Sequence, residues 1–325
     1  MQAFPGPAFS PRIPMVVVGA LRAGGSGKTS VTAALARLCQ AEGWRVAILA
    51  YRIHGGASRR GGILQEVGSD ADWRHSSDEA LLLRAGGARV FVTRNRALAW
   101  RRLEAGEAGP FDIILSDDGF QDPRLAGAFR ILLQAPGESP GLGSLLPAGP
   151  FRETGGNRRR ADWILEGPYP GSNAPAAPVP SAGVAGAAGA AEASPLRGRF
   201  WRAQVFPAGC DRSGSWLVLC GLGDNGRFTR DLRACGVRPL ALLAMPDHAA
   251  PSGRQLSAYA RRFPGAGFLC TRKDAMKLDA RTQERYSIHV VDEWVTLDSR
   301  LFPAIREYRA QFGVSAGAIL VHYRR

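Results

Sequence analysis

The sequence predicts an α/β protein, with a parallel sheet covered by helices and a second, smaller α/β domain after it. Two features lead to this expectation. An apolar run that begins at Met15 enters a glycine-rich turn ending in Gly27, Lys28 and Thr29. Short apolar strands then alternate with helical stretches along the chain, a pattern typical of parallel sheets with helices on both faces.

The glycine-rich turn, within MVVVGALRAGGSGKT at residues 15–29, has the pattern of a phosphate-binding loop. Its glycines let the backbone take a tight, partly left-handed path that points N–H groups at an anion. Lys28 would set its charge against the outer phosphates, the Thr29 hydroxyl would bind Mg²⁺, and the next helix would offer its positive N-terminus. A P-loop NTPase-like domain is therefore predicted. The predicted nucleotide-binding residues are Arg22, Ala23, Gly24, Gly25, Ser26, Gly27, Lys28 and Thr29.

The alternative is a plain glycine turn between a strand and a helix. Such a turn does not require Lys-Thr directly after its last glycine, so the phosphate-binding interpretation is favoured. The match is incomplete at one position, because Arg22 stands where the strict pattern has glycine.

The first predicted domain spans residues 1–167. Val31 and Leu35 recur at helical spacing until Gly43 ends the helix, and the apolar run RVAILA follows at 45–50, which completes a β-α-β unit. Four further apolar runs predict strands at residues 90–92, 111–118, 129–134 and 162–167.

Residues 168–196 are predicted to form a linker or loose surface loop. Pro, Ala, Gly and Ser dominate this segment and Glu192 is its only charged residue, a composition that cannot build a packed core. A second α/β domain is predicted for residues 197–325. Its expected elements are strands at 215–222, 239–245, 267–271 and 287–291, and helices near 228–235, 252–263 and 299–312.

The net charge of +14 favours anionic partners, such as nucleic acid, an acidic membrane surface or a phosphorylated substrate. The five cysteines form no C-x-x-C pair, which disfavours a disulfide framework or a zinc site and fits a reducing cytoplasm. The chain has neither a run of about eighteen apolar residues nor a signal-peptide pattern. Any membrane contact is therefore expected to be peripheral.

Acidic side chains stand at two places where chemistry could occur. Asp117 and Asp118 end a predicted strand, where ligands gather in open α/β sheets, and with Thr29 they could hold Mg²⁺. The alternative there is an Asp-Gly turn capped by its own carboxylate. Taken alone, Asp78 and Glu79 are better explained as the acidic first turn of a helix behind a serine cap, an arrangement that needs no chemistry.

Taken in order, these segments resemble the tetraacyldisaccharide 4′-kinases of lipid A synthesis. The similarity runs from Val16 to about Leu278, and PAGPFRE together with DDGFQ is more specific than the phosphate loop alone. The matching segments are VGALRAGGSGKT (18–29), DEALLL (78–83), TRNR (93–96), SDDGFQDPRL (116–125), LLPAGPFRE (145–153), CGLGDNGRF (220–228), PDH (246–248) and TRKDAMKL (271–278).

The resemblance implies a two-domain kinase that transfers the γ-phosphate of ATP to the 4′-hydroxyl of a lipid-linked glucosamine disaccharide 1-phosphate. Lys28 and the loop amides would hold the phosphates of ATP. The residues implied to hold Mg²⁺ are Thr29, Glu79, Asp117 and Asp118.

The resemblance also implies that Asp78 is the general base and that His248 orients or assists it. By itself, His248 would be taken for an ordinary surface or hydrogen-bonded histidine. Because these two residues come from different predicted domains, they would meet in a cleft whose closure excludes water. Together with Lys28 they are the predicted catalytic residues.

The chain departs from the family pattern at several positions. Ala20 stands where asparagine is usual, Ser30 where proline is usual, and Asp122 where histidine is common. Relatives often carry an apolar segment ahead of the first strand, whereas about fourteen residues precede Met15 here. The resemblance implies a peripheral protein on the cytoplasmic face of the inner membrane. Candidate contacts with anionic lipid are Arg158 to Arg160 and the cluster Arg197, Arg199, Trp201 and Arg202, with a solvated basic face as the alternative.

Three other functions compete with the kinase. Positioning ATPases with a deviant loop need a lysine directly before the two glycines, where this chain has Ala23. A degenerate paralogue would bind nucleotide without lipid kinase activity. Nucleic-acid binding has only the charge in its favour, since no basic-aromatic module accompanies it. The sequence thus predicts a kinase whose partners are a lipid-linked disaccharide and an anionic membrane surface, without nucleic acid or an obligate protein partner.

Overall fold

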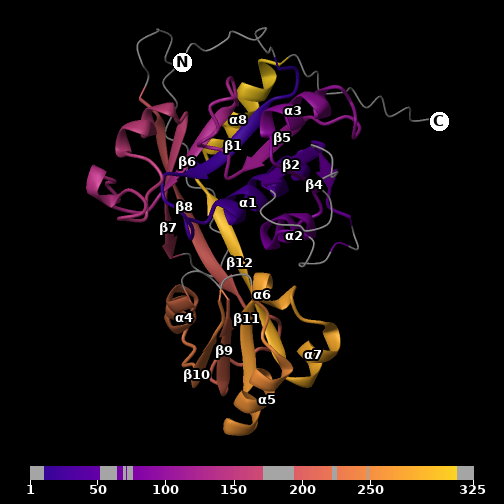
Figure 1. Cartoon of the computed structure of the whole chain (residues 1–325), viewed down its shortest axis with the longest axis vertical. Coiled ribbons are helices and arrows are strands. Elements are labelled where there is room, and N and C mark those ends of the chain that lie inside the picture. Colours follow the sequence, from indigo (N-terminus) through magenta and orange to yellow (C-terminus); the bar gives the residue numbers. More distant parts are fainter. Residues whose placement is uncertain are drawn as a thin grey trace, which may run out of the picture.

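The structure is a computed structural model that describes residues 11–51, 64–68, 71, 76–170, 194–221, 225–246 and 249–312. Within these residues, twelve strands form one continuous sheet in the order β10-β9-β11-β12-β8-β7-β6-β1-β5-β2-β4-β3. Figure 1 shows a larger lobe built around β1 to β7 at the top and a smaller lobe with β9, β10 and β11 below it.

The elements of the chain up to residue 170 all belong to the larger lobe. They are β1 (Met15–Ala20), α1 (Lys28–Ala41), β2 (Val46–Tyr51), β3 (Gln65–Glu66), α2 (Asp78–Ala85), β4 (Arg89–Thr93), α3 (Arg96–Glu104), β5 (Ile113–Asp117), β6 (Phe129–Gln134), the short 3-10 helices η1 (Leu142–Ser144) and η2 (Gly155–Arg160), and β7 (Trp163–Pro170).

The elements from residue 194 onward connect and complete the two lobes. They are β8 (Leu196–Val205), β9 (Trp216–Cys220), α4 (Asn225–Ala234), β10 (Ala241–Ala244), α5 (Gly253–Arg262), β11 (Gly267–Thr271), α6 (Arg272–Ala275), α7 (Ala280–Arg285), β12 (Ile288–Leu297) and α8 (Leu301–Ala310).

The predicted α/β class is confirmed, and most strand pairs are parallel. In the larger lobe β1 pairs in parallel with β5 and β6, β2 with β4 and β5, and β6 with β7. In the smaller lobe β9 pairs in parallel with β10 and β11. Among the described strands, the antiparallel pairs are β3 with β4 and β8 with β12. The carboxyl ends of the parallel strands in each lobe therefore lie at one edge of the sheet, where ligands bind in this class of fold.

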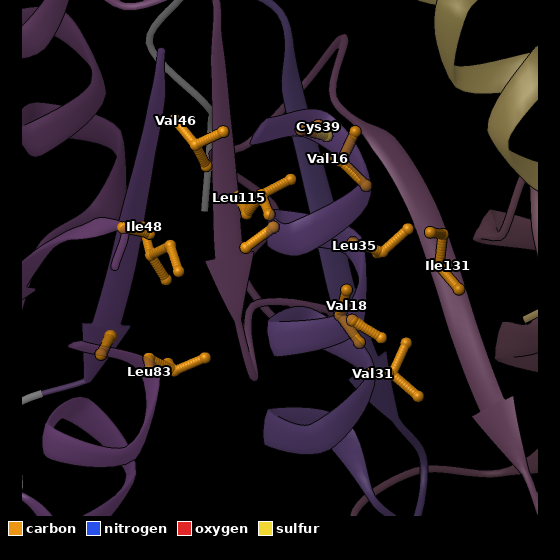
Figure 2. Close-up of a cluster of buried hydrophobic side chains, with 14 of the residues drawn as sticks. Val16, Val18, Val31, Leu35, Cys39, Val46, Ile48, Leu83, Leu115 and Ile131 are labelled. Atoms are coloured by element: carbon orange, nitrogen blue, oxygen red, sulfur yellow. The ribbon is translucent and has the colours of Figure 1, made fainter. Parts of the chain in front are cut away.

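The core of the larger lobe holds β1 between two layers of helices. Because successive side chains of a strand point to opposite faces of the sheet, Val16 packs with Leu35 of α1 (Figure 2). Val17 packs on the other face with Trp100 of α3. All six residues of β1 are buried. The strand that leads into the glycine-rich loop is thus fixed from both sides.

Two long strands join the lobes. The first part of β12, Ile288 to Val291, pairs in parallel with β11, and the rest, Asp292 to Leu297, pairs antiparallel with β8. β8 continues the sheet by pairing with β7. The sequence predicted only residues 287–291 of β12 as a strand and did not predict β8.

The chain returns to the larger lobe after β12. Leu301 and Ile305 of α8 are fully buried in the cluster beneath α1, so this lobe is built from both ends of the described sequence. Within the predicted linker, β7 continues to Pro170 and β8 begins at Leu196. Residues 171–193 lie outside the described residues. The division of the chain into two domains at 167 and 197 stays a prediction.

Candidate active site

The glycine-rich loop connects the carboxyl end of β1 to the start of α1. Gly24, Gly25 and Gly27 have φ angles of 70°, 62° and 82°, which lie in the left-handed region that favours glycine. Gly27 is the N-cap of α1, and it has no side chain that could accept a hydrogen bond from a backbone N–H of the first turn. The N-terminal amides of α1 are thus left for an anion from outside the helix. The Lys28 ammonium lies 3.2 Å from the Ser26 hydroxyl.

The loop is held in place by a segment of the PAGPFRE motif. The Ala23 N–H donates to the Pro150 carbonyl at 2.8 Å, and the Arg152 N–H donates to the Leu21 carbonyl at 2.7 Å. Between these bonds, the Arg22 side chain lies over the Phe151 ring. The loop and the motif therefore form one local structure, although about 130 residues separate them in the sequence.

The smaller lobe also reaches the loop. Arg227 of α4 donates from Nη1 to the Gly25 carbonyl at 2.6 Å. A contact within the larger lobe adds to this: the guanidinium of Arg22, on the loop, lies 3.7 Å from the Glu138 carboxylate.

Asp117, the last residue of β5, is the buried acid of the site. Its two carboxylate oxygens accept from Thr29 Oγ1 at 2.9 Å and from Thr32 Oγ1 at 3.1 Å, both on α1. Burial, with the neighbouring Asp118 charge, raises the pKa of Asp117 to about 6, although the two hydroxyls act in the opposite direction. Arg96 donates to the Asp117 carbonyl at 2.6 Å. A site that contained a cation would relieve this unfavourable burial of charge.

Asp118 follows in a turn that only some residue types tolerate. Its φ is 54°, and aspartate is among the few non-glycine residues found there. Its carboxylate lies 3.6 Å from the Lys28 ammonium and accepts from Arg152 Nη1 at 2.9 Å. Gly119 comes next, and a Cβ there would lie 2.5 Å from the Ser116 hydroxyl. The SDDG sequence thus turns the chain directly after β5, and the Asp118 carboxylate at this turn faces the loop lysine.

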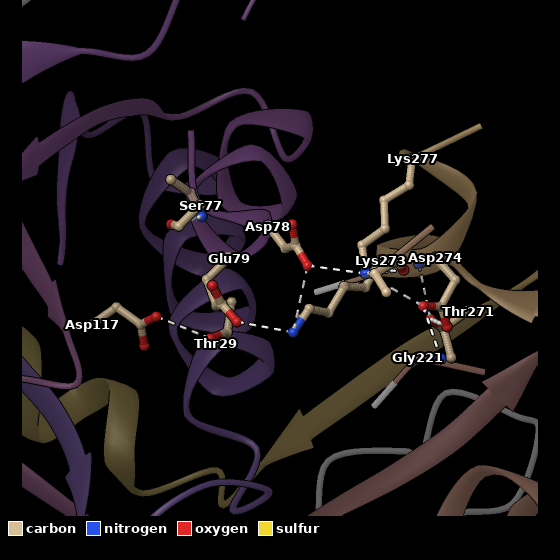
Figure 3. Close-up of polar contacts among 12 residues, drawn as sticks. Thr29, Ser77, Asp78, Glu79, Asp117, Gly221, Thr271, Lys273, Asp274 and Lys277 are labelled. Atoms are coloured by element: carbon tan, nitrogen blue, oxygen red, sulfur yellow. Dashed lines mark hydrogen bonds and ion pairs between the residues drawn. The ribbon is translucent and has the colours of Figure 1, made fainter. Parts of the chain in front are cut away.

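Asp78 is the first residue of α2, with Ser77 as the N-cap that accepts from the Ala80 N–H at 3.2 Å. The helix-start interpretation of Asp78 therefore describes its backbone correctly. Its side chain does more than complement the helix, because it is buried and points at the smaller lobe. Asp78 Oδ2 lies 3.1 Å from Lys277 Nζ and 3.7 Å from Lys273 Nζ (Figure 3).

Glu79 lies beside Asp78 at the start of α2. Its Oε1 accepts from Lys273 Nζ at 3.0 Å. Its Oε2 is buried and has no hydrogen-bond partner among the residues that the structure describes. An unsatisfied buried carboxylate oxygen is costly, which suits a position that receives a cation or a hydrogen-bond donor from a ligand.

Comparison with known proteins identifies the family. A family model described as Tetraacyldisaccharide-1-P 4′-kinase matches residues 6–308. The chain belongs to the tetraacyldisaccharide-1-P 4′-kinase family. The resemblance of the motifs to these kinases is thereby confirmed.

Individual members of this kinase family align over most of the chain. A tetraacyldisaccharide 4′-kinase of Gluconacetobacter diazotrophicus is 38% identical over 298 residues, which cover 87% of this chain and 81% of the relative. One from Azoarcus is 37% identical over 279 residues, with 82% and 73% covered. The fold is similar to a crystal structure of an "apo" form of LpxK from Aquifex aeolicus in complex with ATP, with a TM-score of 0.64, 24% identity, and 92% of this chain and 88% of that chain covered.

The structure brings together most of the side chains predicted for this kinase family. Four of these side chains adjoin one another beside the loop: Lys28, Thr29, Asp117 and Asp118. Lys28 and Thr29 follow the loop directly in the sequence. Asp78 and Glu79 lie together on the side that faces the smaller lobe. His248 lies outside the described residues. These positions are given by the fold, and the roles assigned to the residues stay predictions.

Several charged residues of the site were not predicted from the sequence. They lie in the motifs TRNR, LLPAGPFRE and TRKDAMKL and are Arg96, Arg152, Lys273 and Lys277. The signal for the lysines was their four-residue spacing, which places two ammonium groups on one side of a helical turn.

The residues present fit a nucleoside triphosphate with Mg²⁺. The left-handed glycines, the uncapped start of α1 and Lys28 suit phosphate oxygens, whereas the oxygens of Thr29 and Asp117 suit a hard cation. Within the described ranges, no group of three or more His, Cys, Asp or Glu side chains could hold a metal. Mg²⁺ in nucleotide sites usually takes phosphate oxygens and water as ligands besides one or two protein oxygens.

Proposed function

We propose that this protein is a kinase that transfers the γ-phosphate of ATP to the 4′-hydroxyl of tetraacyldisaccharide 1-phosphate in lipid A biosynthesis. The observation that carries the proposal is the family match over residues 6–308, supported by relatives 38% and 37% identical that are named tetraacyldisaccharide 4′-kinase. A regulatory ATPase without kinase activity is not favoured, because the match extends far beyond the nucleotide loop.

The larger lobe would bind the nucleotide. The amides of the loop and the start of α1 would cradle the phosphates, and Lys28 would move its ammonium from Asp118 to the phosphate oxygens. The Thr29 hydroxyl and the Asp117 carboxylate would hold the metal. Mg²⁺ bound there would offset charge on the phosphates during transfer.

Asp78 would accept the proton of the sugar hydroxyl as the new O–P bond forms. A sugar hydroxyl is a weak nucleophile, and a carboxylate within hydrogen-bond reach can take its proton. Asp78 is supported in this role by its position on α2, where it faces the smaller lobe, and His248 would assist it. Enclosure between the lobes would keep water from competing as phosphate acceptor.

An activity measurement with matched variants tests the proposal. Purified protein is incubated with Mg-ATP and the tetraacyl disaccharide 1-phosphate, and lipid products are analysed by mass. We expect one added phosphate, lost in Lys28→Ala and in Asp78→Ala. Arg281→Ala, which changes an exposed residue of α7, is the control and should retain activity. A wild-type protein that binds ATP but forms no phosphorylated lipid would overturn the proposal.

We also propose that the protein works as a peripheral protein on the cytoplasmic face of the inner membrane. In the part of the chain that the structure describes, no helix is long and apolar enough to span a bilayer. The candidate arginines differ in their surroundings. Arg158 bonds to the Glu138 carbonyl and Arg160 to Glu153, whereas Arg159 is exposed.

The segment before PAGPFRE supports a specific contact with lipid. Leu142 is 80% exposed and Leu146 is 54% exposed, and the segment is anchored near Arg159 by the Gly155 N–H, which donates to the Pro140 carbonyl at 3.1 Å. Exposed leucines in a segment that is hydrogen-bonded to the arginine-bearing η2 suit insertion at the surface of an anionic bilayer.

Sedimentation with vesicles tests this contact. Leu142→Asp combined with Leu146→Asp should reduce binding to vesicles that contain an anionic phospholipid. Leu240→Asp is the matched control, since Leu240 is 51% exposed in the smaller lobe. Equal binding by the double variant and the control would contradict the assignment of the membrane contact to these leucines.

A further inference from the structure

A buried lysine of the smaller lobe makes an ion pair with the predicted base of the larger lobe. The Lys277 side chain has no exposed surface, and its ammonium lies 3.1 Å from Asp78 Oδ2. Nζ also donates to the Ala249 carbonyl at 3.4 Å and lies 3.7 Å from Asp274 Oδ1. Burying an ammonium group is unfavourable unless it is paired and hydrogen-bonded. Lys277 therefore occupies a position that is built around its charge.

Asp274 fixes this lysine to the sheet of the smaller lobe. Its Oδ1 accepts from the Gly221 N–H at 3.1 Å, and its Oδ2 accepts from Thr271 Oγ1 at 2.8 Å. Gly221 follows β9 and Thr271 ends β11, so Asp274 is bonded to the carboxyl ends of two parallel strands. A Cβ at Gly221 would lie 2.9 Å from Asp274 Oδ1, and glycine is what allows this close approach.

These contacts form a connected path between the two lobes, visible in Figure 3. It runs from the strand ends of the smaller lobe through Asp274 and Lys277 to Asp78 at the start of α2. Lys273 also approaches Asp78, but it is closer to Glu79, at 3.0 Å against 3.7 Å. Lys277 is thus the lysine whose nearest carboxylate is Asp78.

We propose that Lys277 is a positioning residue for phosphate transfer, which holds the Asp78 carboxylate in its working orientation when the smaller lobe is docked against α2. This inference rests on the proposed kinase function, in which Asp78 accepts the proton of the sugar hydroxyl. Lys277 touches neither the nucleotide loop nor its metal-binding side chains in the contacts above. Its effect should therefore appear in the chemical step and spare ATP binding.

The first test separates chemistry from binding. Lys277→Met removes the charge and keeps a similar volume. We expect kcat to fall by about 100-fold, the order of loss that misplacement of a catalytic group causes, while the Kd for ATP changes less than about twofold. Arg272→Met is the control, because Arg272 lies in the same segment and pairs with Asp292 at the surface. An unchanged kcat for Lys277→Met would overturn the proposal.

A double-mutant cycle distinguishes positioning of Asp78 from a general structural role. If Lys277 acts through Asp78, then kcat of the double variant Asp78→Asn with Lys277→Met should fall no further than kcat of Asp78→Asn alone. Multiplied losses in the double variant would overturn the inference.

A charge-conserving variant covers the case in which Lys277→Met does not fold. Lys277→Arg keeps the cation, and its kcat should lie within about tenfold of the wild-type value. A tenfold loss corresponds to roughly 1.4 kcal/mol in the activation free energy. A folded Lys277→Arg protein whose kcat falls further than that would count against the inference. A wild-type protein that forms no phosphorylated lipid would instead overturn the proposed function itself.

Discussion

Replacing Asp117 by asparagine should make the ligand-free protein more stable at neutral pH, although it removes the carboxylate expected to hold Mg²⁺. Asp117 is buried, and its pKa is raised to about 6 by desolvation and by the charge of Asp118. The ordinary value in an unfolded chain is about 3.9. The folded carboxyl group thus binds its proton more tightly than the unfolded one.

The sign and size of the effect follow from that difference. Between about pH 4 and pH 6 the folded state binds more protons than the unfolded state, so stability falls as the pH rises through this window. Above it, the full difference of about two pKa units opposes folding by about 3 kcal/mol. Asparagine avoids this cost but offers one oxygen to Thr29 and Thr32 instead of two, a loss of about 1 kcal/mol. The net gain is about 2 kcal/mol at pH 8 and well under 1 kcal/mol at pH 5.

Urea unfolding of Asp117→Asn in the presence of a chelator measures both values. Asp112→Asn is the matched control, because hydrogen bonds from Arg45 hold the pKa of Asp112 below its usual value despite its partial burial. That substitution should destabilise the protein at pH 8, with the opposite sign. The prediction is wrong if the Asp117→Asn variant is less stable than wild type at pH 8, or if the substitution stabilises the protein equally at pH 5 and pH 8.

Three further predictions concern packing and thiols. Phe200→Ala should lower the free energy of unfolding by about 3–5 kcal/mol, because the ring is buried in the core of the larger lobe; a loss below about 1 kcal/mol in urea titration would contradict this. Gly19→Ala should lower Tm, since a Cβ there would lie 2.3 Å from the Phe120 Cβ; an unchanged Tm speaks against it. Ellman's reagent should modify Cys210 in the folded protein. Burial raises the pKa of Cys39 to about 12, so Cys39 should react only after unfolding; labelling of Cys39 in the folded protein would contradict this.

The larger lobe was predictable from the sequence because its strands carry their own signal. The runs that became β2, β4, β5 and β6 are short, apolar and buried on both faces, as expected for a parallel sheet. The glycine-rich loop was equally local, since the backbone conformation it needs is written in the glycines themselves. The helix of residues 28–41 also ends before Gly43, as predicted, and this glycine takes a φ of 76°.

The connection between the lobes could not be predicted, because it depends on partners far away in the chain. β8 alternates exposed arginines with the buried Gly198 and Phe200, so Arg197 and Arg199 seemed to belong to a basic surface cluster. Its identity as a strand comes from pairing with β7 and β12. In the same way β12 changes its partner after Val291, where no sequence feature marks the change.

The contacts of the site likewise divide into those that the sequence predicts and those that depend on distant parts of the chain. The contact between Thr29 and Asp117 was expected, because Asp117 ends β5, and the loop that leads to Thr29 at the start of α1 leaves the neighbouring parallel strand β1 at the same edge of the sheet. The contact of Asp78 with Lys277 joins residues 199 positions apart on different lobes. Only the docking of the two lobes brings that pair together, and spacing within one motif carries no information about it.

The proposed kinase activity is tested most sharply by locating the phosphate in the product. The protein is incubated with Mg-ATP and the tetraacyl disaccharide 1-phosphate, and the purified lipid is examined by phosphorus-proton correlation NMR. We expect a new phosphomonoester coupled to the proton at position 4′, in an amount equal to the ADP formed. Phosphate at another hydroxyl, or ADP and inorganic phosphate without modified lipid, would contradict it.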